Sequence, residues 1–394
     1  MTPSASADLP PLAVYIHWPY CARICPYCDF NVVRDRGQAE QAALAQAIVA
    51  DLRGQASLVG TRRLVSVFFG GGTPSLMRPE WVGAIVAEAR RLWPASGSVE
   101  ISLEANPTDA EAGRFAGFAE AGVNRLSLGV QALDDEALRF LGRNHDSAEA
   151  LRAIGLARAR FERLSIDLIY ARPGQSAAEW ADELRRAADL GAEHISPYQL
   201  TIEPGTAFDR AVGRGLFAPP GPDASAELYE ITQGVLGAAG FDAYEVSNHA
   251  RGEAARSRHN LAYWRGEDYL GAGPGAHGRI TLGGGRVATE AEPKPPVYIA
   301  RVAASGSGLA AVDLLQPRDV AIERLLMGLR IDEGVAWSEL AALGLDPGAS
   351  IVTQLAAEGL VAAGEDRLVA TRRGRAVLDS LAAALVPDPS RVRS

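Results

Sequence analysis

The sequence predicts an α/β fold: an incomplete TIM-type (β/α)6 barrel, then an α+β extension and a C-terminal winged-helix-like module. Over residues 12–204, six short β-type runs alternate with helical stretches, which is typical of βαβ units and a parallel sheet. Residues 205–312 are rich in glycine and aromatic residues and have few periodic segments, which favours an extension at the edge of the barrel. Residues 316–387 are predicted to form three helices, a hairpin and a last helix.

Six units in sequence fit a partial barrel better than an open doubly wound sheet, an alternative that the pattern leaves open. The predicted strands are Leu12–His17, Leu64–Phe69, Val99–Glu104, Arg125–Val130, Leu164–Ile169 and His194–Leu200. Helices are expected between them at 38–54, 79–92, 109–120, 134–159 and 176–190. Residues 1–11 are rich in Pro, Ser and Ala and are expected to be mobile.

Length and composition indicate a soluble globular protein. The chain has 394 residues, enough for two or three domains of about 150 residues each. Its net charge of −9 argues against nonspecific nucleic-acid binding, so no nucleic-acid partner is expected. Neither a signal peptide nor an apolar run of membrane-spanning length is present. A cytoplasmic location is therefore the default expectation, and peripheral membrane contact stays open.

The C-terminal segment resembles a winged helix in its order of elements. Helices are expected at 319–330, 336–342 and 347–358, a hairpin at 359–371 and a last helix at 373–385. The candidate recognition helix, Pro347–Gly359, contains no Lys or Arg, although DNA readout depends on such residues. A packing or partner-docking module is favoured over a DNA-binding regulator.

The three cysteines of the chain, Cys21, Cys25 and Cys28, lie within eight residues. An odd, clustered set argues against a disulfide framework and indicates metal or redox chemistry. The C-x3-C-x2-C spacing suits an iron–sulfur cube, because three thiolates ligate three irons and leave the fourth iron open to a small molecule. A zinc site that also uses His17 is the alternative, although structural zinc usually takes paired C-x2-C units.

Further polar motifs follow the predicted strands. The glycines of Gly70–Ser75 let the backbone approach a ligand closely and expose N–H groups. Glu104 and Gln131 end two strands, Arg143 lies in the run Leu141–Asn144, and Asp167 lies in an apolar run where a carboxylate is costly unless paired. Each residue alone could be a cap or a surface pair. Together they lie near the carboxyl ends of successive strands, where barrel active sites are built.

With Tyr27 directly before the last cysteine, the cysteine motif resembles the signature of the radical S-adenosylmethionine superfamily. From Tyr15 to the C-terminal module, the chain is similar to its coproporphyrinogen oxidase-like branch and, within that, to HemW-type heme chaperones. The resemblance implies a [4Fe–4S] cluster on the three cysteines, with S-adenosylmethionine at the open iron. It also implies that S-adenosylmethionine is bound by Tyr15, Tyr27, Gly71, Gly72, Thr73, Glu104, Gln131, Arg143 and Asp167, with Thr201 a weaker match.

The resemblance leaves two functions. One is an oxygen-independent coproporphyrinogen III oxidase, which decarboxylates propionate side chains by radical chemistry. The other is a heme chaperone, which binds heme and passes it to an acceptor protein. The chaperone is favoured because Phe30 stands where such oxidases carry a further cysteine, and because the segment before the first strand is short.

The segment His259–Trp264 matches the H-N-x-x-Y-W motif associated with heme binding in HemW-type proteins. The imidazole of His259 is a candidate axial ligand of heme iron, with Tyr263 and Trp264 as flat faces for the porphyrin. A hydrogen-bonded structural corner is the other interpretation of this histidine.

Other residues of the same region are candidates for contact with heme. Arg256 and Arg258 are candidates to pair with heme propionates, and His249 and His277 are competing axial candidates. Gly271–Gly275 has glycine spacing like that of nucleotide-binding loops, but Pro274 lacks an N–H donor. This run is therefore predicted to be a turn.

Overall fold

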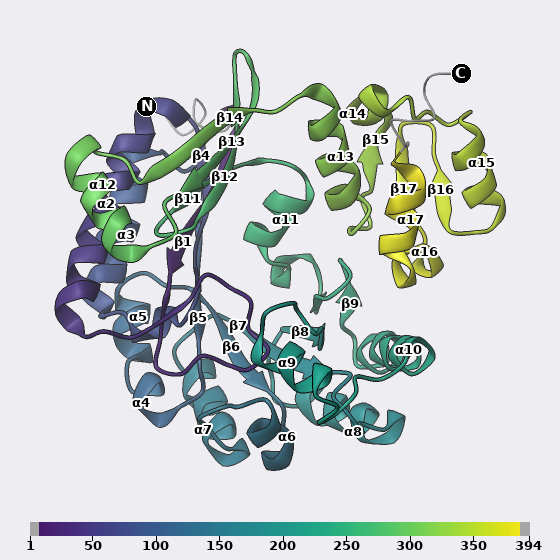
Figure 1. Cartoon of the computed structure of the whole chain (residues 1–394), viewed down its shortest axis with the longest axis horizontal. Coiled ribbons are helices and arrows are strands. Elements are labelled where there is room, and N and C mark those ends of the chain that lie inside the picture. Colours follow the sequence, from purple (N-terminus) through teal and green to yellow (C-terminus); the bar gives the residue numbers. More distant parts are fainter. Residues whose placement is uncertain (1–7, 387–394) are drawn as a thin grey trace.

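The computed structural model describes residues 8–386, so residues 1–7 of the segment expected to be mobile lie outside the described range. The described residues fold around one large mixed sheet flanked by helices, with a smaller module at the C-terminal end (Figure 1). Across this sheet, the strand order is β14-β13-β12-β11-β1-β4-β5-β6-β7-β8-β10-β9.

Six neighbouring strands in the middle of the sheet run parallel, which confirms the predicted fold class. Most of their residues are buried, as expected for parallel strands covered by crossover helices. They are β1 (Pro11–Trp18), β4 (Arg63–Gly71), β5 (Glu100–Ala105), β6 (Arg125–Gln131), β7 (Arg163–Tyr170) and β8 (His194–Gln199).

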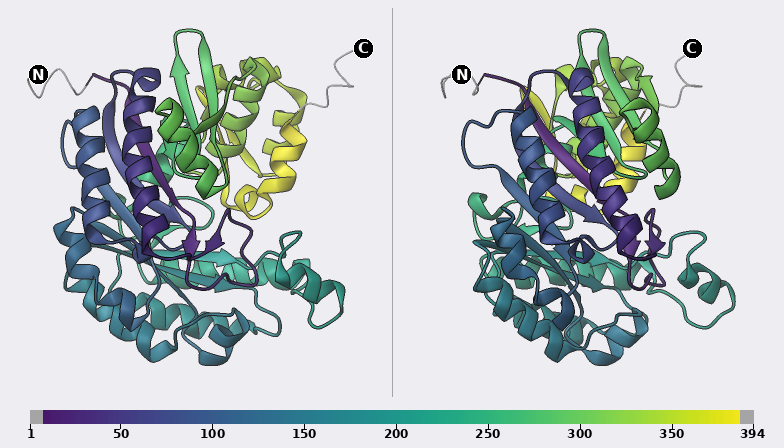
Figure 2. Two further views of the ribbon diagram at one scale, coloured as in Figure 1. Left: turned by 60° about the vertical axis from the view of Figure 1, so that its left-hand side comes forward. Right: turned by 90° about the vertical axis from the view of Figure 1, so that its left-hand side faces the viewer.

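Helices between these strands pack on the outer face of the sheet (Figure 2). Two begin with a capping box, in which Asp146 and Glu149, or Ser176 and Glu179, bond each other's backbone N–H groups. The helices are α2 (Gln38–Val59), α3 (Pro79–Leu92), α4 (Asp109–Ala112), α5 (Phe115–Glu120), α6 (Asp135–Phe140), α7 (Ser147–Arg158) and α8 (Ala177–Ala188).

The prediction of one helix over 134–159 is wrong. The chain forms α6 and α7 instead, because Gly142 takes a left-handed conformation (φ 68°) that ends the first helix. The break matters for the site, since it places Arg143 in a loop beneath the cysteines. The helices expected over 109–120 and 373–385 are likewise each divided in two.

Residues 205–312 add strands to both edges of the parallel sheet. β11 pairs parallel with β1, and β10 pairs antiparallel with β8. The predicted turn after β11 is confirmed, with Gly273 and Gly275 both at positive φ. The elements are α9 (Ala207–Gly213), α10 (Pro222–Ala238), β9 (Asp242–Ala243), β10 (His249–Ala250), η2 (Glu253–Ala255), α11 (Arg258–Trp264), β11 (Asp268–Ala272), β12 (His277–Leu282), β13 (Gly285–Ala291), α12 (Pro295–Ser305) and β14 (Leu309–Leu314).

The C-terminal module has its own hydrophobic core, which includes Leu325, Leu368 and Leu381. Its small sheet has the order β15-β17-β16, as expected for a winged helix. The module lies on the opposite side of the large sheet from α2 and α3 (Figures 1 and 2). Its elements are α13 (Pro317–Gly328), β15 (Val335–Ala336), α14 (Trp337–Leu340), η3 (Ala341–Leu343), α15 (Ser350–Ala357), β16 (Val361–Ala363), β17 (Arg367–Ala370), α16 (Arg372–Ala376) and α17 (Leu378–Leu385).

Candidate functional site

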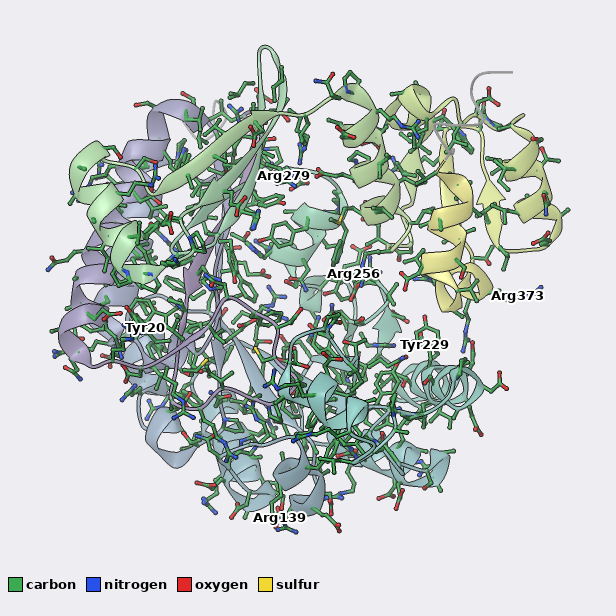
Figure 3. The ribbon with its side chains drawn as sticks, viewed as in Figure 1. Tyr20, Arg139, Tyr229, Arg256, Arg279 and Arg373 are labelled. Atoms are coloured by element: carbon green, nitrogen blue, oxygen red, sulfur yellow. The ribbon has the colours of Figure 1, made fainter. Side chains whose placement is uncertain are left out.

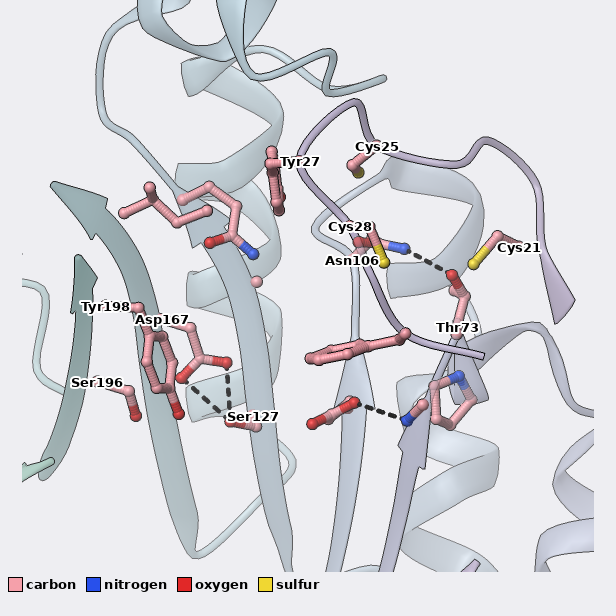
Figure 4. Close-up of a pocket in the computed structure, with 18 of the residues that line it drawn as sticks. Cys21, Cys25, Tyr27, Cys28, Thr73, Asn106, Ser127, Asp167, Ser196 and Tyr198 are labelled. Carbon is pink, nitrogen blue, oxygen red and sulfur yellow. Dashed lines mark hydrogen bonds between the residues drawn. The ribbon is translucent and has the colours of Figure 1, made fainter. Parts of the chain in front are cut away.

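A cavity of about 640 Å³ opens at the carboxyl ends of the parallel strands. Its size is typical of a small-molecule site. The structure brings together most of the residues that the sequence singled out (Figure 4). The cavity is lined by Tyr15, Cys21, Cys25, Tyr27, Cys28, Gly71, Gly72, Thr73, Glu104, Gln131, Asp167, Thr201, His259 and Tyr263.

Cys21 ends β2 (Tyr20–Cys21), and Cys25 and Cys28 lie on the cysteine loop that follows it, before β3 (Val33–Arg34). All three lie across the cavity from Asp167 and Tyr198 (Figure 4). Cys21 is buried and the other two are half-buried. Burial raises the pKa of the Cys21 thiol to about 11, while a hydrogen bond with Thr73 lowers it. Burial also raises the pKa of Cys28. These thiols are therefore protonated at neutral pH unless a metal or cation stabilises the thiolates.

The positively charged guanidinium of Arg143 lies against this loop. Its Nη1 atom lies 3.2 Å from the sulfur of Cys25 and 3.4 Å from the hydroxyl of Tyr27. Its Nη2 atom donates to the carbonyl of Gly129, at 3.2 Å, and to the side chain of Asn106. The guanidinium therefore ties the cysteine loop to the ends of β5 and β6.

The backbone of the glycine motif plays a different part from the expected one. Its N–H groups do not face the cavity as free donors: Gly71 donates to Glu104 Oε2 (3.3 Å), Gly72 to Trp18 O (2.7 Å) and Thr73 to Tyr20 O (2.9 Å). The last two bonds attach the cysteine loop to the sheet. What this backbone can offer a ligand is carbonyl oxygens, which accept hydrogen bonds from an ammonium group.

Two half-buried carboxyl groups, of Glu104 and Asp167, line the cavity. Burial raises the pKa of Glu104 to about 8, and the charge of Asp167 adds to the effect. Burial also raises the pKa of Asp167, which accepts hydrogen bonds from Ser127 (2.9 Å) and Ser165 (3.1 Å). Glu104 is therefore poised to lose its proton when a cationic ligand arrives.

Backbone strain occurs at the carboxyl ends of two of the parallel strands. Gln131 and Ala171, at the ends of β6 and β7, are non-glycine residues at positive φ (67° and 59°). Such conformations are costly and cluster at functional sites. Gln131 was singled out from the sequence, whereas this strain could not be read from it.

The predicted heme segment is only partly open to solvent. His259 is buried, and its ring nitrogens contact Ser66 Oγ (2.9 Å) and Tyr263 Oη (2.8 Å). Burial lowers the pKa of this imidazole to about 3, so it is neutral. Trp264 lines a second cavity instead of the first.

The two arginines that were candidates to pair with propionates are engaged elsewhere. Arg258 bonds the carbonyl of Ser98 at 2.6 Å, and Arg256 pairs with Asp332 at 3.3 Å. Neither is among the residues that line the two cavities described here. Arg256 lies between the barrel and the C-terminal module (Figure 3).

Sequence reasoning missed several residues of the cavity. Asn106 links Thr73 to Arg143, and its position just before a proline at a strand end was the available signal. Arg125 begins β6, where only strand pairing brings it beneath the cavity. Other polar residues that were missed include Ser127, Ser196 and Tyr198.

Two features are absent from the described residues. No three His, Cys, Asp or Glu side chains converge as ligands of a single ion do. Within the same residues, no helix has the length and apolar character needed to cross a membrane.

Comparison with known proteins identifies the superfamily to which this fold belongs. Residues 15–187 match the radical SAM superfamily, and residues 315–377 match the HemN C-terminal domain. The crystal structure of Escherichia coli coproporphyrinogen III oxidase (HemN) superposes with a TM-score of 0.80, over 98% of this chain and 92% of that one, at 23% identity. Fold and cysteine loop together define a radical S-adenosylmethionine protein.

Two groups of relatives identify the family within this superfamily. Heme chaperone HemW of Escherichia coli is 40% identical over 73% of this chain and 75% of its own length. Radical S-adenosyl methionine domain-containing protein 1, mitochondrial, of Mus musculus is 40% identical over 98% of this chain and 89% of its own length. The chain belongs to the radical SAM superfamily, in the family of HemW and of this domain-containing protein.

Proposed function

We propose that the protein is a heme chaperone that carries a [4Fe–4S] cluster, binds S-adenosylmethionine and transfers heme to an acceptor protein. The observation that carries the proposal is the 40% identity with a protein named heme chaperone HemW, combined with the cysteine loop above one large cavity. A cytoplasmic location is proposed with it. The names of the animal relatives place those proteins in mitochondria.

The residues present fit the cluster. Three thiols share one loop, one of them contacts a guanidinium, and the surrounding hydrogen bonds fix that loop to the sheet. Cys21, Cys25 and Cys28 would hold three irons. When bound, such a cluster supplies one electron and an open iron that takes the amino and carboxylate groups of S-adenosylmethionine.

The chain's own residues would hold the nucleoside around that point. The carbonyls near Gly71 and the Glu104 carboxylate suit the ammonium group, and the Asp167 carboxylate suits ribose hydroxyls. Tyr15, Tyr27, Thr73 and Gln131 complete the proposed contacts. Arg143 would position the cysteine loop and neutralise thiolate charge.

The oxidase is the second candidate. The Escherichia coli oxidase shares this fold, and a common fold does not decide between the two activities. Phe30 favours the chaperone, because it stands where the oxidases carry a further cysteine; its side chain is 63% exposed and lines the cavity.

Two experiments decide between the candidates. Anaerobically reconstituted protein is titrated with hemin, and a Soret band that saturates near one heme per chain is expected. Failure to bind heme overturns the chaperone proposal. In the second, coproporphyrinogen III, S-adenosylmethionine and a reductant are added, and formation of protoporphyrinogen would establish the oxidase instead.

The C-terminal module is proposed to dock onto the barrel or a protein partner. Helix α15 carries no basic side chain, which disfavours DNA as its target. Anisotropy of a random duplex at low salt is the check, and salt-sensitive binding would contradict this assignment.

A further inference from the structure

A second cavity, of about 360 Å³, lies between the β11–β13 edge of the sheet and the C-terminal module. Its walls come from β1, α11, β11, β12, β13 and α13. Tyr15 and Tyr263 line both cavities, so the two spaces adjoin at these side chains. Helix α11 lies between the sheet and α13 (Figure 1).

This cavity has aromatic walls. Tyr263, Trp264 and Tyr269 line it, and the rings of Tyr263 and Tyr269 meet edge to face with their centres 4.4 Å apart. Large flat rings offer contact area to a planar aromatic ligand at little cost in conformational entropy. The last two residues of the His259–Trp264 motif therefore open onto this space.

The arginines of the walls are already paired with carboxylates. Arg279, Arg286 and Arg324 line the cavity. Arg279 pairs with Glu323 at 2.8 Å, Arg324 with Glu339 at 2.5 Å and Arg286 with Asp268 at 3.5 Å. Arg279 lies between the β12–β13 strands and α13 (Figure 3). These ion pairs offset the positive charge of the walls, so the aromatic rings and the histidine are the groups that a ligand would contact.

One imidazole of the chain is free to bind a metal here. His277 lines the second cavity, its side chain is exposed, and its ring makes no hydrogen bond within the described residues. His17 also lines this cavity, but both its ring nitrogens are engaged, with Tyr15 at 3.1 Å and with the carbonyl of Asn31 at 2.9 Å.

The remaining four of the six histidines are less suited. Both ring nitrogens of His259 are engaged, and His145, His194 and His249 are buried and do not line either cavity. Met327 adds a thioether to the lining of the second cavity. His and Met are both found as axial ligands of heme iron.

From these contacts we propose that heme binds in the second cavity, with the imidazole of His277 as its axial ligand and the rings of Tyr263, Trp264 and Tyr269 against the porphyrin. In this assignment His259 positions Tyr263 through their 2.8 Å hydrogen bond and does not contact iron. The inference rests on the proposed heme-binding function and goes beyond it in naming the cavity and the ligand.

The test is a hemin titration of full-length, cluster-loaded protein, read as a difference spectrum against the same sample without hemin. Wild type, His277→Ala, His259→Ala and His249→Ala are compared by affinity and by electron paramagnetic resonance of the ferric heme. We expect only His277→Ala to lose the imidazole-ligated signature, with affinity reduced by about tenfold or more, the change that 1.4 kcal/mol produces. Exogenous imidazole should restore the signature in His277→Gly.

The outcomes separate the two proposals. If wild type binds no hemin, the chaperone function itself fails. If wild type binds hemin and His277→Ala keeps its affinity and signature, the chaperone function stands and the assignment of His277 is overturned. If His259→Ala is the one variant that loses the imidazole-ligated signature, the heme iron is assigned to the first cavity instead. Circular dichroism of each variant controls for folding.

Discussion

The guanidinium of Arg143 lies 3.2 Å from the sulfur of Cys25, although the two residues are 118 positions apart in the chain. This contact joins the loop between α6 and α7 to the cysteine loop between β2 and β3. It exists because Gly142 ends α6 with a left-handed turn and directs the next residue toward the cavity. A single guanidinium thereby contacts both a cysteine sulfur and a carbonyl oxygen of β6.

Replacing this cation should weaken the site. Arg143→Gln is expected to lower S-adenosylmethionine affinity of the cluster-loaded protein by about 10- to 100-fold, the size expected for losing hydrogen bonds to a charged group. Equilibrium dialysis measures the affinity. Arg139→Gln, on the exposed face of α6, is the matched control and should change little. Unchanged affinity in Arg143→Gln would remove this residue from the site.

Each cysteine should be required for the cluster. Cys21→Ser, Cys25→Ser and Cys28→Ser are each expected to lose most of the bound iron and sulfide after anaerobic reconstitution, because each thiolate would hold its own iron. The chain has no other cysteine, so no neighbouring thiol can substitute. Iron and sulfide assays per chain give the result. A variant that retains four irons would show that its cysteine is not a ligand.

Glu104 should make stability depend on pH. Its pKa is about 8 in the folded chain against an ordinary value of 4.5, so the folded state keeps a proton that the unfolded state has lost between these values. The free energy of unfolding of the ligand-free protein should therefore fall as pH rises through this window. Glu104→Gln should remove this dependence, giving a gain over wild type of a few kcal/mol at about pH 8.5 and little at about pH 5.

Urea unfolding at the two pH values measures this difference. Asp167 shares the environment, so Asp167→Asn is the companion variant and should flatten the profile in part. An equal gain for Glu104→Gln at both pH values would contradict the raised pKa. If the ammonium group of S-adenosylmethionine pairs with Glu104, binding near pH 7 should also release a proton, which calorimetry in buffers of different ionisation enthalpy detects.

Gly71 should not tolerate a side chain. Its φ is 111°, and an added Cβ would lie 2.6 Å from the ring of His17. Gly71→Ala is therefore expected to cost about 1–3 kcal/mol of stability and to displace the adjoining cysteine loop. Gly155→Ala is the control: Gly155 lies within α7 with open space around it, so alanine should be neutral or slightly stabilising. Equal unfolding midpoints for both variants would refute this.

Much of the fold followed from local patterns. The alternation of strand and helix over 12–204 predicted the parallel sheet, because the period of apolar residues is a local property of each segment. Helix breaks were missed where one glycine, Gly142, outweighs helical propensity on both sides. The edge strands β11 to β14 were also missed, since their pairing depends on distant partners such as β1.

The sequence by itself determined the class of chemistry: three thiols at C-x3-C-x2-C spacing and polar residues at successive strand ends have few other uses. Only the tertiary structure decided how those groups are used. It engaged the N–H groups of Gly72 and Thr73 with the cysteine loop, buried His259 between two hydroxyls, and left His277 free in a separate cavity. The physical reason is that hydrogen bonding and burial depend on which segments meet, and residues separated by hundreds of positions meet only in the folded chain.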